Sequence, residues 1–317
     1  MDKNTKEIIR ITKDLIEFKS ITRKAGEINN CLNYIRKYLE KFHIEEYSYN
    51  HVKSLVISKK PAKKFKYILL GHIDVVPAED SQFNPRVTEE AIYGRGSADM
   101  KGGVAIAMLL MKNLELEHTA LIITSDEEIG GSNGAERLAE KYTADFVIAL
   151  EPTDEKITVK KKGTMWLTIT ASGKAGHGSM PWTGENAAER LIETYNEIRD
   201  FLPKIEKDSS EEEKWQTSHN IGMINAGSES YNVIPEKASL GLDIRFPKSE
   251  DPNQLIESIK RIAKRHKCKA EGDYVQPVYT NPENESVKRL QKIGNLELWK
   301  EYGTSDIRPF NLKGIAA

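Results

Sequence analysis

Hydrophobic positions in the first half of the chain change their spacing several times. Apolar residues recur at helical spacing in residues 6–19 and 28–42, which predicts two packing helices. Short apolar runs, typical of buried strands, then alternate with further helix-like stretches. The strand-like runs are residues 53–58, 67–71, 120–124 and 145–150, and the helix-like stretches lie near residues 103–116 and 134–141. This alternation predicts an α/β fold with a mixed, mostly parallel sheet flanked by helices on both faces.

A different pattern begins after Lys162. Residues 165–170 alternate apolar and polar side chains, as in a half-exposed strand, and an amphipathic segment follows at residues 186–201. Two more strands, a helix and a last strand are then predicted at residues 219–226, 238–246, 252–266 and 269–275. This order predicts a ferredoxin-like α+β domain. We therefore expect a main domain, formed by residues 1–163 and 277–317, that carries an insertion at residues 164–276.

Composition narrows the class of protein. A chain of 317 residues exceeds one average domain, which agrees with an insertion. The 47 basic and 48 acidic residues nearly cancel, so no electrostatic footprint for nucleic acid or an anionic membrane is present. The longest apolar run, Val104 to Met111, is far shorter than the ~20 residues of a membrane helix, and no secretory signal is evident. We expect a cytoplasmic protein.

Cysteine usage agrees with a reducing compartment. Cys31 and Cys268 are far apart in the sequence, and neither belongs to a CxxC motif. The sequence therefore indicates neither a disulfide framework nor a zinc site built from thiolates.

The stretch "KYILLGHIDVVP", residues 66–77, is the first candidate for chemistry. Its apolar part predicts a buried strand that ends near Gly71, and an extended chain would place His72 and Asp74 on one face. A carboxylate beside a histidine fixes the imidazole tautomer of a metal ligand. A core histidine satisfied by a local acid explains this pair equally well, so the remaining segments must decide.

Acidic residues follow two other predicted strands, and another lies in a glycine-rich loop. "SDEE" supplies Asp126, Glu127 and Glu128, Glu151 follows the strand that ends near Leu150, and Asp99 lies in "GRGSADMKGG". Ligands bind at the carboxyl ends of strands in open α/β sheets. So much negative charge at one edge would repel itself without a cation. Imidazole and carboxylate ligands suit zinc or cobalt, and a shared carboxylate suits two metals. The alternative, helix caps and surface acids, becomes weak once these segments are combined.

The inserted domain contributes three further candidates. His177 lies between glycines in "GKAGHGSMP", where it is well placed to approach a ligand, although a simple loop histidine is the alternative. Asn232 and Arg245 lie in "YNVIPEKASLGLDIRFP". Arg245 could clamp a carboxylate in a bidentate manner, whereas an arginine on a strand is more often a surface residue.

These motifs together resemble one family. "GHIDVVP", "GRGSADMKGG", "SDEEIGG", "EPT", "GHGSMP", "NVIP", "DIRFP" and "GTSDIR" are similar to motifs of the zinc metallohydrolases that include succinyl-diaminopimelate desuccinylase, acetylornithine deacetylase, aminoacylase and glutamate carboxypeptidase. The match extends over roughly residues 6 to 308. The resemblance implies a zinc-exopeptidase-like main domain that is catalytic, an inserted lid or dimerisation domain, and a homodimer.

The resemblance also implies a role for each matching residue. Asp99 would bridge two zinc ions, His72 and Glu151 would hold one of them, and Glu128 would help to hold the other. Glu127 would be the general base, and Asp74 would orient His72. The Asp99–Met100 peptide is expected to be cis. His177 would reach the active site of the partner subunit and stabilise an oxyanion. Three residues would contact a substrate with a free carboxylate: Asn232, Arg245 and Arg308.

The end of the chain departs from the family pattern. Family members continue beyond "GTSDIR" to a histidine that completes the second metal site, whereas this chain ends at Ala317 and has no histidine after His266. We expect a C-terminal strand and helix of the family's sheet to be missing and the second metal to lack one ligand. An ordinary enzyme that has lost its tail and a short form that binds one metal or none are the alternatives.

The sequence thus predicts a metal-dependent amidohydrolase that removes an acetyl, succinyl or similar acyl group from a small amino acid. A dipeptidase or carboxypeptidase of the same family is one alternative. A metal-deficient binding or dimeric assembly protein is an alternative from another class.

Overall fold

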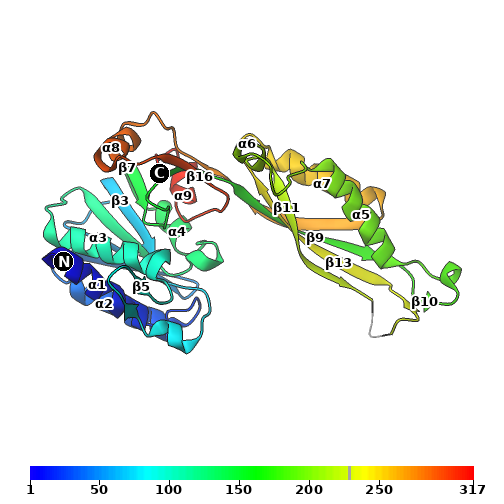
Figure 1. Cartoon of the computed structure of the whole chain (residues 1–317), viewed down its shortest axis with the longest axis horizontal. Coiled ribbons are helices and arrows are strands. Elements are labelled where there is room, and N and C mark those ends of the chain that lie inside the picture. The colour runs from blue at the N-terminus through cyan, green and yellow to red at the C-terminus, as the bar shows by residue number, and fades with distance from the viewer. Residues whose placement is uncertain (228–229) are drawn as a thin grey trace. The chain divides into compact units, whose positions relative to one another are not determined.

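The computed structural model describes residues 1–227 and 230–317, which form two compact units (Figure 1). The first unit consists of Met1–Val159, Thr280–Trp299 and Ser305–Ala317. The second unit consists of Lys160–Tyr279 and Lys300–Thr304. No helix in the described part of the chain is both long and apolar enough to cross a membrane.

A five-stranded sheet in the order β1-β2-β6-β3-β7 forms the centre of the first unit. Its strands are His43–Tyr49 (β1), Val52–Ser58 (β2), Lys64–His72 (β3), Thr119–Thr124 (β6) and Thr143–Ala149 (β7). β3 runs parallel to both β6 and β7, whereas β1 with β2 and β2 with β6 are antiparallel. The predicted α/β fold with a mixed sheet is confirmed, but only two of its four strand pairs are parallel.

One strand of the sheet, β1, is not revealed by the hydrophobic pattern. β1 has the sequence His-Ile-Glu-Glu-Tyr-Ser-Tyr and pairs only with β2, so it lies at the edge of the sheet and needs few apolar residues. Asn50 and His51, which connect β1 to β2, both have positive φ, as a two-residue hairpin turn requires.

Helices of the first unit bury their apolar faces against this sheet. They are Lys3–Glu17 (α1), Ala25–Tyr38 (α2), Gly102–Asn113 (α3), Ala135–Ala139 (α4), Glu285–Gly294 (α8) and Arg308–Leu312 (α9). Fully buried side chains of the first three, among them Ile11, Ile35 and Met108, share one core with Leu121 of β6. This packing holds α1 and α3 close to the carboxyl end of β3, where the candidate site lies.

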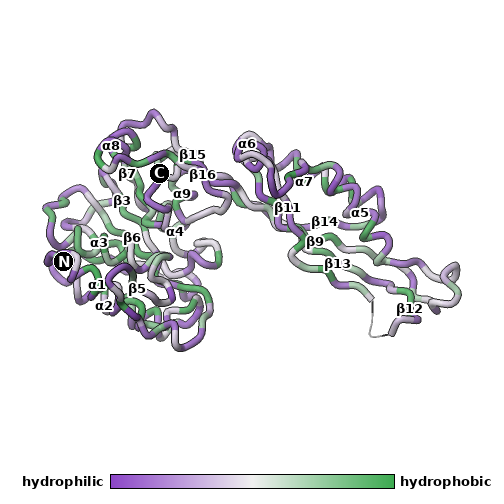
Figure 2. Tube along the Cα trace, viewed as in Figure 1, coloured by the Kyte–Doolittle hydropathy of each residue, from purple (hydrophilic) through white to green (hydrophobic). Residues whose placement is uncertain are grey.

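The second unit is a four-stranded antiparallel sheet in the order β11-β13-β9-β14. Its elements are Gly163–Ser172 (β9), Ala187–Phe201 (α5), Glu211–Lys214 (α6), Ser218–Ala226 (β11), Lys237–Phe246 (β13), Pro252–Arg265 (α7) and Cys268–Val275 (β14). Every second residue of β13 is buried, and these residues share a core with Leu191 of α5 and Ile259 of α7. The two helices therefore cover one face of the sheet. Figure 2 shows hydrophobic and hydrophilic residues following one another along both helices. The ferredoxin-like insertion is confirmed.

Short strands complete the structure. Gly176–His177 (β10) pairs with Val233–Ile234 (β12), and Arg86–Val87 (β4) pairs with Ile92–Tyr93 (β5). A three-stranded sheet has the order β15-β8-β16, formed by Val278–Tyr279, Ile157–Lys161 and Leu298–Glu301. Short 3-10 helices are formed by Asp80–Phe83 (η1), Glu127–Ile129 (η3) and Pro181–Thr183 (η4). A short π-helical turn is formed by Ser97–Lys101 (η2).

Candidate metal centre

The parallel strands of the first unit bring the predicted site residues to one edge of the sheet. β3 is buried from Ile68 onward and pairs with β6 and β7 in register, so all three strands end at the same level. His72 is the last residue of β3, Glu127 follows β6 and Glu151 follows β7. The carboxyl edge of a parallel sheet is therefore where these side chains meet, as the sequence predicts.

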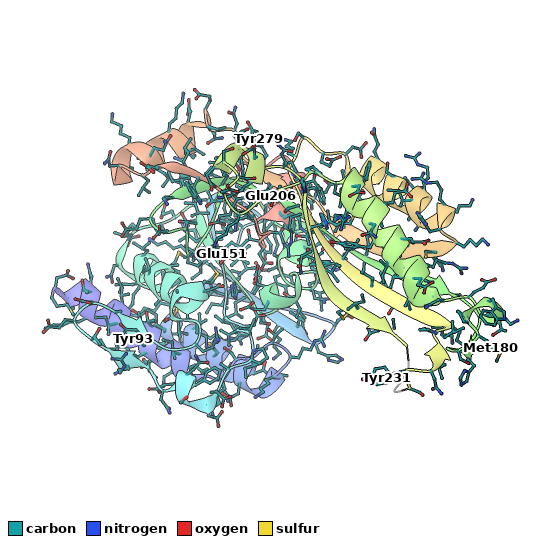
Figure 3. All side chains as sticks on the ribbon, turned by 45° about the vertical axis from the view of Figure 1, so that its right-hand side comes forward. Tyr93, Glu151, Met180, Glu206, Tyr231 and Tyr279 are labelled. Atoms are coloured by element: carbon teal, nitrogen blue, oxygen red, sulfur yellow. The ribbon has the colours of Figure 1, made fainter. Side chains whose placement is uncertain are left out.

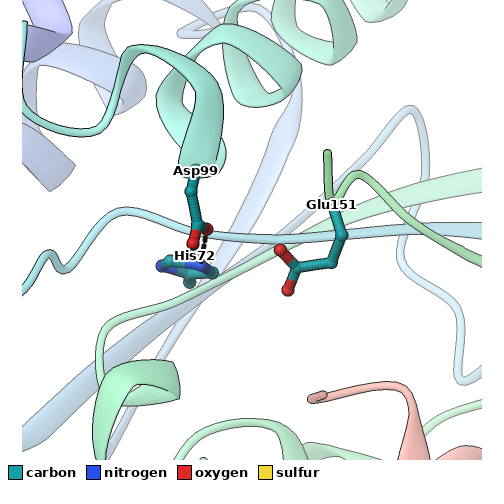
Figure 4. Close-up of side chains that lie close together, drawn as sticks. All are labelled: His72, Asp99 and Glu151. Carbon is teal, nitrogen blue, oxygen red and sulfur yellow. Dashed lines mark hydrogen bonds and ion pairs between the residues drawn. The ribbon is translucent and has the colours of Figure 1, made fainter. Parts of the chain in front are cut away.

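Three side chains form a group that could hold a metal ion (Figure 4). One ligand atom from each of His72, Asp99 and Glu151 lies within 4.8 Å of the others. His72 Nε2 is 3.2 Å from Asp99 Oδ1, and His72 Nδ1 is 2.9 Å from the main-chain oxygen of Asp74. With a proton on Nδ1 donated to that oxygen, the lone pair of Nε2 faces two carboxylates. An imidazole nitrogen and two carboxylates are a donor set that fits zinc.

The imidazole is held in a buried and acidic environment. Only 1% of the His72 side chain is exposed. Burial alone would lower its pKa, but the carboxylates of Asp74 and Asp99 outweigh burial and raise the pKa well above 6.5. A positive charge is thus strongly favoured at this position, either as a proton on the ring or as a cation beside it.

Asp74 organises the loop that carries the two glutamates. It is fully buried and accepts hydrogen bonds from the hydroxyl of Thr22 at 3.0 Å and from the backbone N–H groups of Glu127 and Glu128 at 3.2 and 3.3 Å. Its carboxylate also lies 3.5 Å from Nδ1 of His72. The structure therefore gives Asp74 contacts with both sides of the site, whereas the sequence predicted contact with His72 alone.

Asp99 lies in a loop that a buried lysine anchors. The Asp99–Met100 peptide is cis, as the resemblance implied, and Lys101 follows it directly. The ammonium of Lys101 is fully buried and donates to the carbonyl oxygens of Leu15 and Phe18, at 2.9 and 3.0 Å. Burial lowers the pKa of Lys101 to about 8. The lysine fastens the loop to the C-terminal end of α1, a role that the sequence analysis did not predict.

Glu127 and Glu128 occupy different positions at the edge of the sheet. An oxygen of Glu127 lies 3.9 Å from Nε2 of His72, and its side chain is 18% exposed. Burial, with the carboxylates of Asp306, Glu151 and Glu128, raises the pKa of Glu127 well above its usual range. Glu128 accepts a hydrogen bond from the N–H of Val76 at 3.2 Å. It is not a member of the three-residue group described above.

Asp306 is a buried acid that the sequence analysis missed. It belongs to "GTSDIR" and accepts a hydrogen bond of 2.9 Å from the hydroxyl of Thr124, at the end of β6. Burial, with the charges of Asp126 and Asp74, raises the pKa of Asp306. Its place in the "GTSDIR" motif could have marked Asp306 as a candidate. The sequence could not show, however, that this segment lies at the edge of the sheet beside Thr124.

Comparison with known proteins identifies similar chains. Residues 159–271 match the family model of a peptidase dimerisation domain. A probable succinyl-diaminopimelate desuccinylase of Staphylococcus aureus strain Mu50 is 31% identical over 291 residues, which cover 80% of this chain and 72% of that protein. The chain belongs to the M20 family of metallopeptidases.

One further relative supports this membership, and one solved structure supports the fold. A succinyl-diaminopimelate desuccinylase of a Nitratiruptor species is 30% identical over 82% of this chain and 73% of its own length. A crystal structure of a tripeptidase from Staphylococcus aureus has the same fold, with a TM-score of 0.76, 22% identity, and coverage of 98% of this chain and 88% of that one. Enzymes of the M20 family are metal-dependent amidohydrolases, so the chain is assigned to that class.

His177 and Asn232, 55 residues apart in the sequence, lie together in the M20 dimerisation domain. The pairing of β10 with β12 joins them, and the N–H of Gly178 donates to the main-chain oxygen of Asn232 at 2.7 Å. The side-chain nitrogens of the two residues are 3.4 Å apart, and Nδ1 of His177 is 2.8 Å from the Ser179 hydroxyl. The imidazole is exposed and held by polar neighbours rather than packed in a core.

The two predicted arginines differ in their contacts. Arg245 forms the expected bidentate clamp, but with Asp243, at 2.8 and 2.9 Å, and it also donates to the Thr164 hydroxyl at 2.7 Å. Arg308 begins α9 in the first unit, and among the residues that the structure describes its one ion-pair contact is with Glu136, at 3.8 Å. Its guanidinium therefore keeps more donors for another carboxylate than that of Arg245.

Proposed function

We propose that this M20 enzyme hydrolyses the amide bond of a small N-acylated amino acid, of the succinyl or acetyl type, and releases a carboxylate and a free amine. The observation that carries the proposal is the 31% identity, over 80% of this chain, to a protein described as a probable succinyl-diaminopimelate desuccinylase. The grouping of His72, Asp99 and Glu151 within 4.8 Å supports the metal dependence.

His72, Asp99 and Glu151 are the residues that we propose to hold one zinc or cobalt ion, with Asp99 shared and Glu128 contributing to a second. A bound ion of this kind supplies Lewis-acid chemistry, which polarises a carbonyl group and acidifies water. Asp74 would keep the imidazole in the tautomer that offers Nε2 to the ion, through the 2.9 Å hydrogen bond from Nδ1 to its main-chain oxygen.

Glu127 is our candidate for the general base. Its pKa is raised by burial and by neighbouring carboxylates, and a base works best when its pKa lies near the working pH. The carboxylate would take the proton from the attacking water and later return it to the leaving amine. The backbone N–H of Glu127 donates a hydrogen bond to the carboxylate of Asp74, which holds the backbone of Glu127 in position.

His177 and Asn232 are proposed to stabilise the oxyanion and to contact the substrate, as donors from the dimerisation domain of a homodimer. Arg308 is proposed as the principal partner of the free carboxylate of the substrate, because Arg245 already forms its clamp with Asp243. This ranking of the two arginines goes beyond what the motifs imply.

The decisive experiment is a substrate panel. The purified chain, incubated with zinc or cobalt, is offered N-succinyl amino acids, N-acetyl amino acids and dipeptides, and the free amine is measured. We expect release from an N-acyl amino acid, and we expect Glu127→Ala to abolish it. Glu140→Gln is the matched control, because Glu140 is an exposed acid of the same unit that pairs with Arg137. Release from dipeptides alone would replace the proposal with a dipeptidase, and no release from any substrate would contradict it.

A further inference from the structure

The second unit contains a surface pocket of about 250 Å³ that is distinct from the residues discussed above. We call it the lysine pocket. It is lined by Lys160, Lys161, Trp215, Pro247, Lys248, Ser249, Val278 and Tyr279, all of which belong to this unit. Tyr279 is labelled in Figure 3. The lining therefore includes three lysines and two aromatic residues.

Half of the residues that line the pocket lie in β-strands. β8 and β15 are antiparallel, and their register places Lys160 opposite Tyr279 and Lys161 opposite Val278. Lys248 lies in the turn that follows β13. In this turn the N–H of Glu250 donates a hydrogen bond to the carbonyl oxygen of Pro247, which is buried. The pocket is thus built from segments that are distant in the sequence but held by the fold.

The lining carries an excess of positive charge. None of the described residues that line the pocket is acidic. Lys161 has an ion-pair partner, Glu301, at 2.8 Å. Within residues 1–227 and 230–317, Lys160 and Lys248 form no ion pair, and both ammonium groups lie over the ring of Tyr279, at 5.8 and 4.4 Å from its centroid. A cation–π contact at an exposed site is weak, so both ammonium groups remain able to bind an anion.

We propose that the lysine pocket binds a small phosphate-type anion, either inorganic phosphate or the phosphate group of a monoester. Lysine ammonium groups bind phosphate oxygens as point charges, and several of them can surround one tetrahedral anion. Both ammonium groups lie within 5.8 Å of one ring centroid, so a single anion in the pocket is attracted by both. The pocket volume is below the roughly 300–1,000 Å³ of pockets that enclose drug-sized ligands, which favours a small anion over a nucleotide.

The test is calorimetric titration of the full chain with inorganic phosphate, and separately with methyl phosphate, at constant ionic strength. The double variant Lys160→Gln with Lys248→Gln removes both unpaired charges. Its matched control is Lys204→Gln with Lys269→Gln, which removes two charges from side chains that are 91% and 69% exposed and lie outside the pocket. Because all four lysines are accessible to solvent, neither variant removes a buried contact, and thermal unfolding verifies that both fold.

We expect saturable binding to the wild type, at least about tenfold weaker binding to the pocket variant, and unchanged binding to the control. Tighter binding of methyl phosphate than of phosphate identifies a monoester as the ligand, and the reverse order identifies the free ion. The proposal is overturned if the wild type shows no saturable binding, if the pocket variant binds as tightly as the wild type, or if the control is weakened equally.

Discussion

The metal centre and the lysine pocket both gather groups of like charge, but they do so at different depths. His72 and Asp74 of the metal centre are at most 1% exposed, whereas Lys248 of the lysine pocket is an exposed side chain on a turn. Burial raises the pKa of Glu127 and of Glu128, and repulsion from neighbouring carboxylates adds to that effect. Water screens the lysines. Under the proposals made above, the metal centre needs a metal cation for its chemistry, whereas the lysine pocket is stable with or without a bound anion.

The largest effect is expected from neutralising the buried acid behind the metal centre. Asp74→Asn removes the charge that accepts hydrogen bonds from Thr22, Glu127 and Glu128, and it brings a side-chain N–H₂ among those donors. We expect about 10- to 100-fold weaker zinc binding, as for other residues that orient metal ligands. We also expect a free energy of unfolding about 2–4 kcal/mol lower. Isothermal titration with zinc and urea denaturation measure the two effects.

Thr22→Val is the matched control for that substitution, because it deletes one hydrogen bond to Asp74 and leaves the charge in place. It should weaken zinc binding far less than Asp74→Asn does. Equal losses in the two variants would show that packing around Asp74, and not its charge, organises the site.

Salt should separate the two sites next. Raising the sodium chloride concentration from about 0.05 to about 0.5 M shortens the screening length severalfold, and it supplies chloride as a competitor for exposed lysines. We expect phosphate binding in the lysine pocket to weaken about tenfold, while zinc binding at the buried centre changes little. Titrations at both concentrations provide the measurement. A phosphate affinity that does not depend on salt would contradict the solvent-accessible character of the pocket.

A buried lysine next to the pocket gives the smallest and most specific effect. Lys162 is fully buried, and it donates to the carbonyl oxygens of Lys214 and Gln216. Burial, with the charge of Lys300, lowers its pKa from 10.5 to about 8. Between these values the unfolded chain binds more protons than the folded one, so the contribution of Lys162 to stability rises with pH.

The variant Lys162→Met tests this dependence. We expect the free energy of unfolding of the wild type, taken relative to that of this variant, to rise from about pH 7.5 to about pH 10. Urea denaturation of both proteins at each pH gives the difference. A constant difference would show that Lys162 keeps an ordinary pKa in the folded chain.

Six helices and eight strands could be predicted because their hydrophobic spacing is regular; they are α1 to α5, α7, β2, β3, β6, β7, β9, β11, β13 and β14. The helices α6, α8 and α9 and the short strands were not predicted. The amphipathic helix predicted at residues 252–266 is α7, Pro252–Arg265, and the apolar run at residues 120–124 is β6, Thr119–Thr124. β1 could not be predicted, since an edge strand with two glutamates gives neither a continuous apolar run nor a strict alternation. Its hairpin with β2 is one of the two antiparallel pairs, and the pairing of β2 with β6 is the other.

The metal centre was predictable to the extent that it follows strand ends. His72 and Glu151 end or follow parallel strands, so one rule about sheet edges brings them together. Lys101 and Asp306 were beyond that rule, because their roles depend on contacts with α1 and with Thr124 that only the folded chain creates. The lysine pocket was likewise invisible in the sequence, since Lys160 and Lys248 are 88 positions apart and only the fold places both over Tyr279.

The most direct test of the central claim is the zinc content of the purified chain at equilibrium, measured for the wild type and for Asp99→Ala. Asp99 lies 3.2 Å from His72 and is more than half exposed, so removing its carboxylate should leave the fold intact. The account predicts at least one tightly bound zinc ion per wild-type chain and a loss of that ion in the variant. Equal zinc content in the two proteins, or none in the wild type, would contradict it.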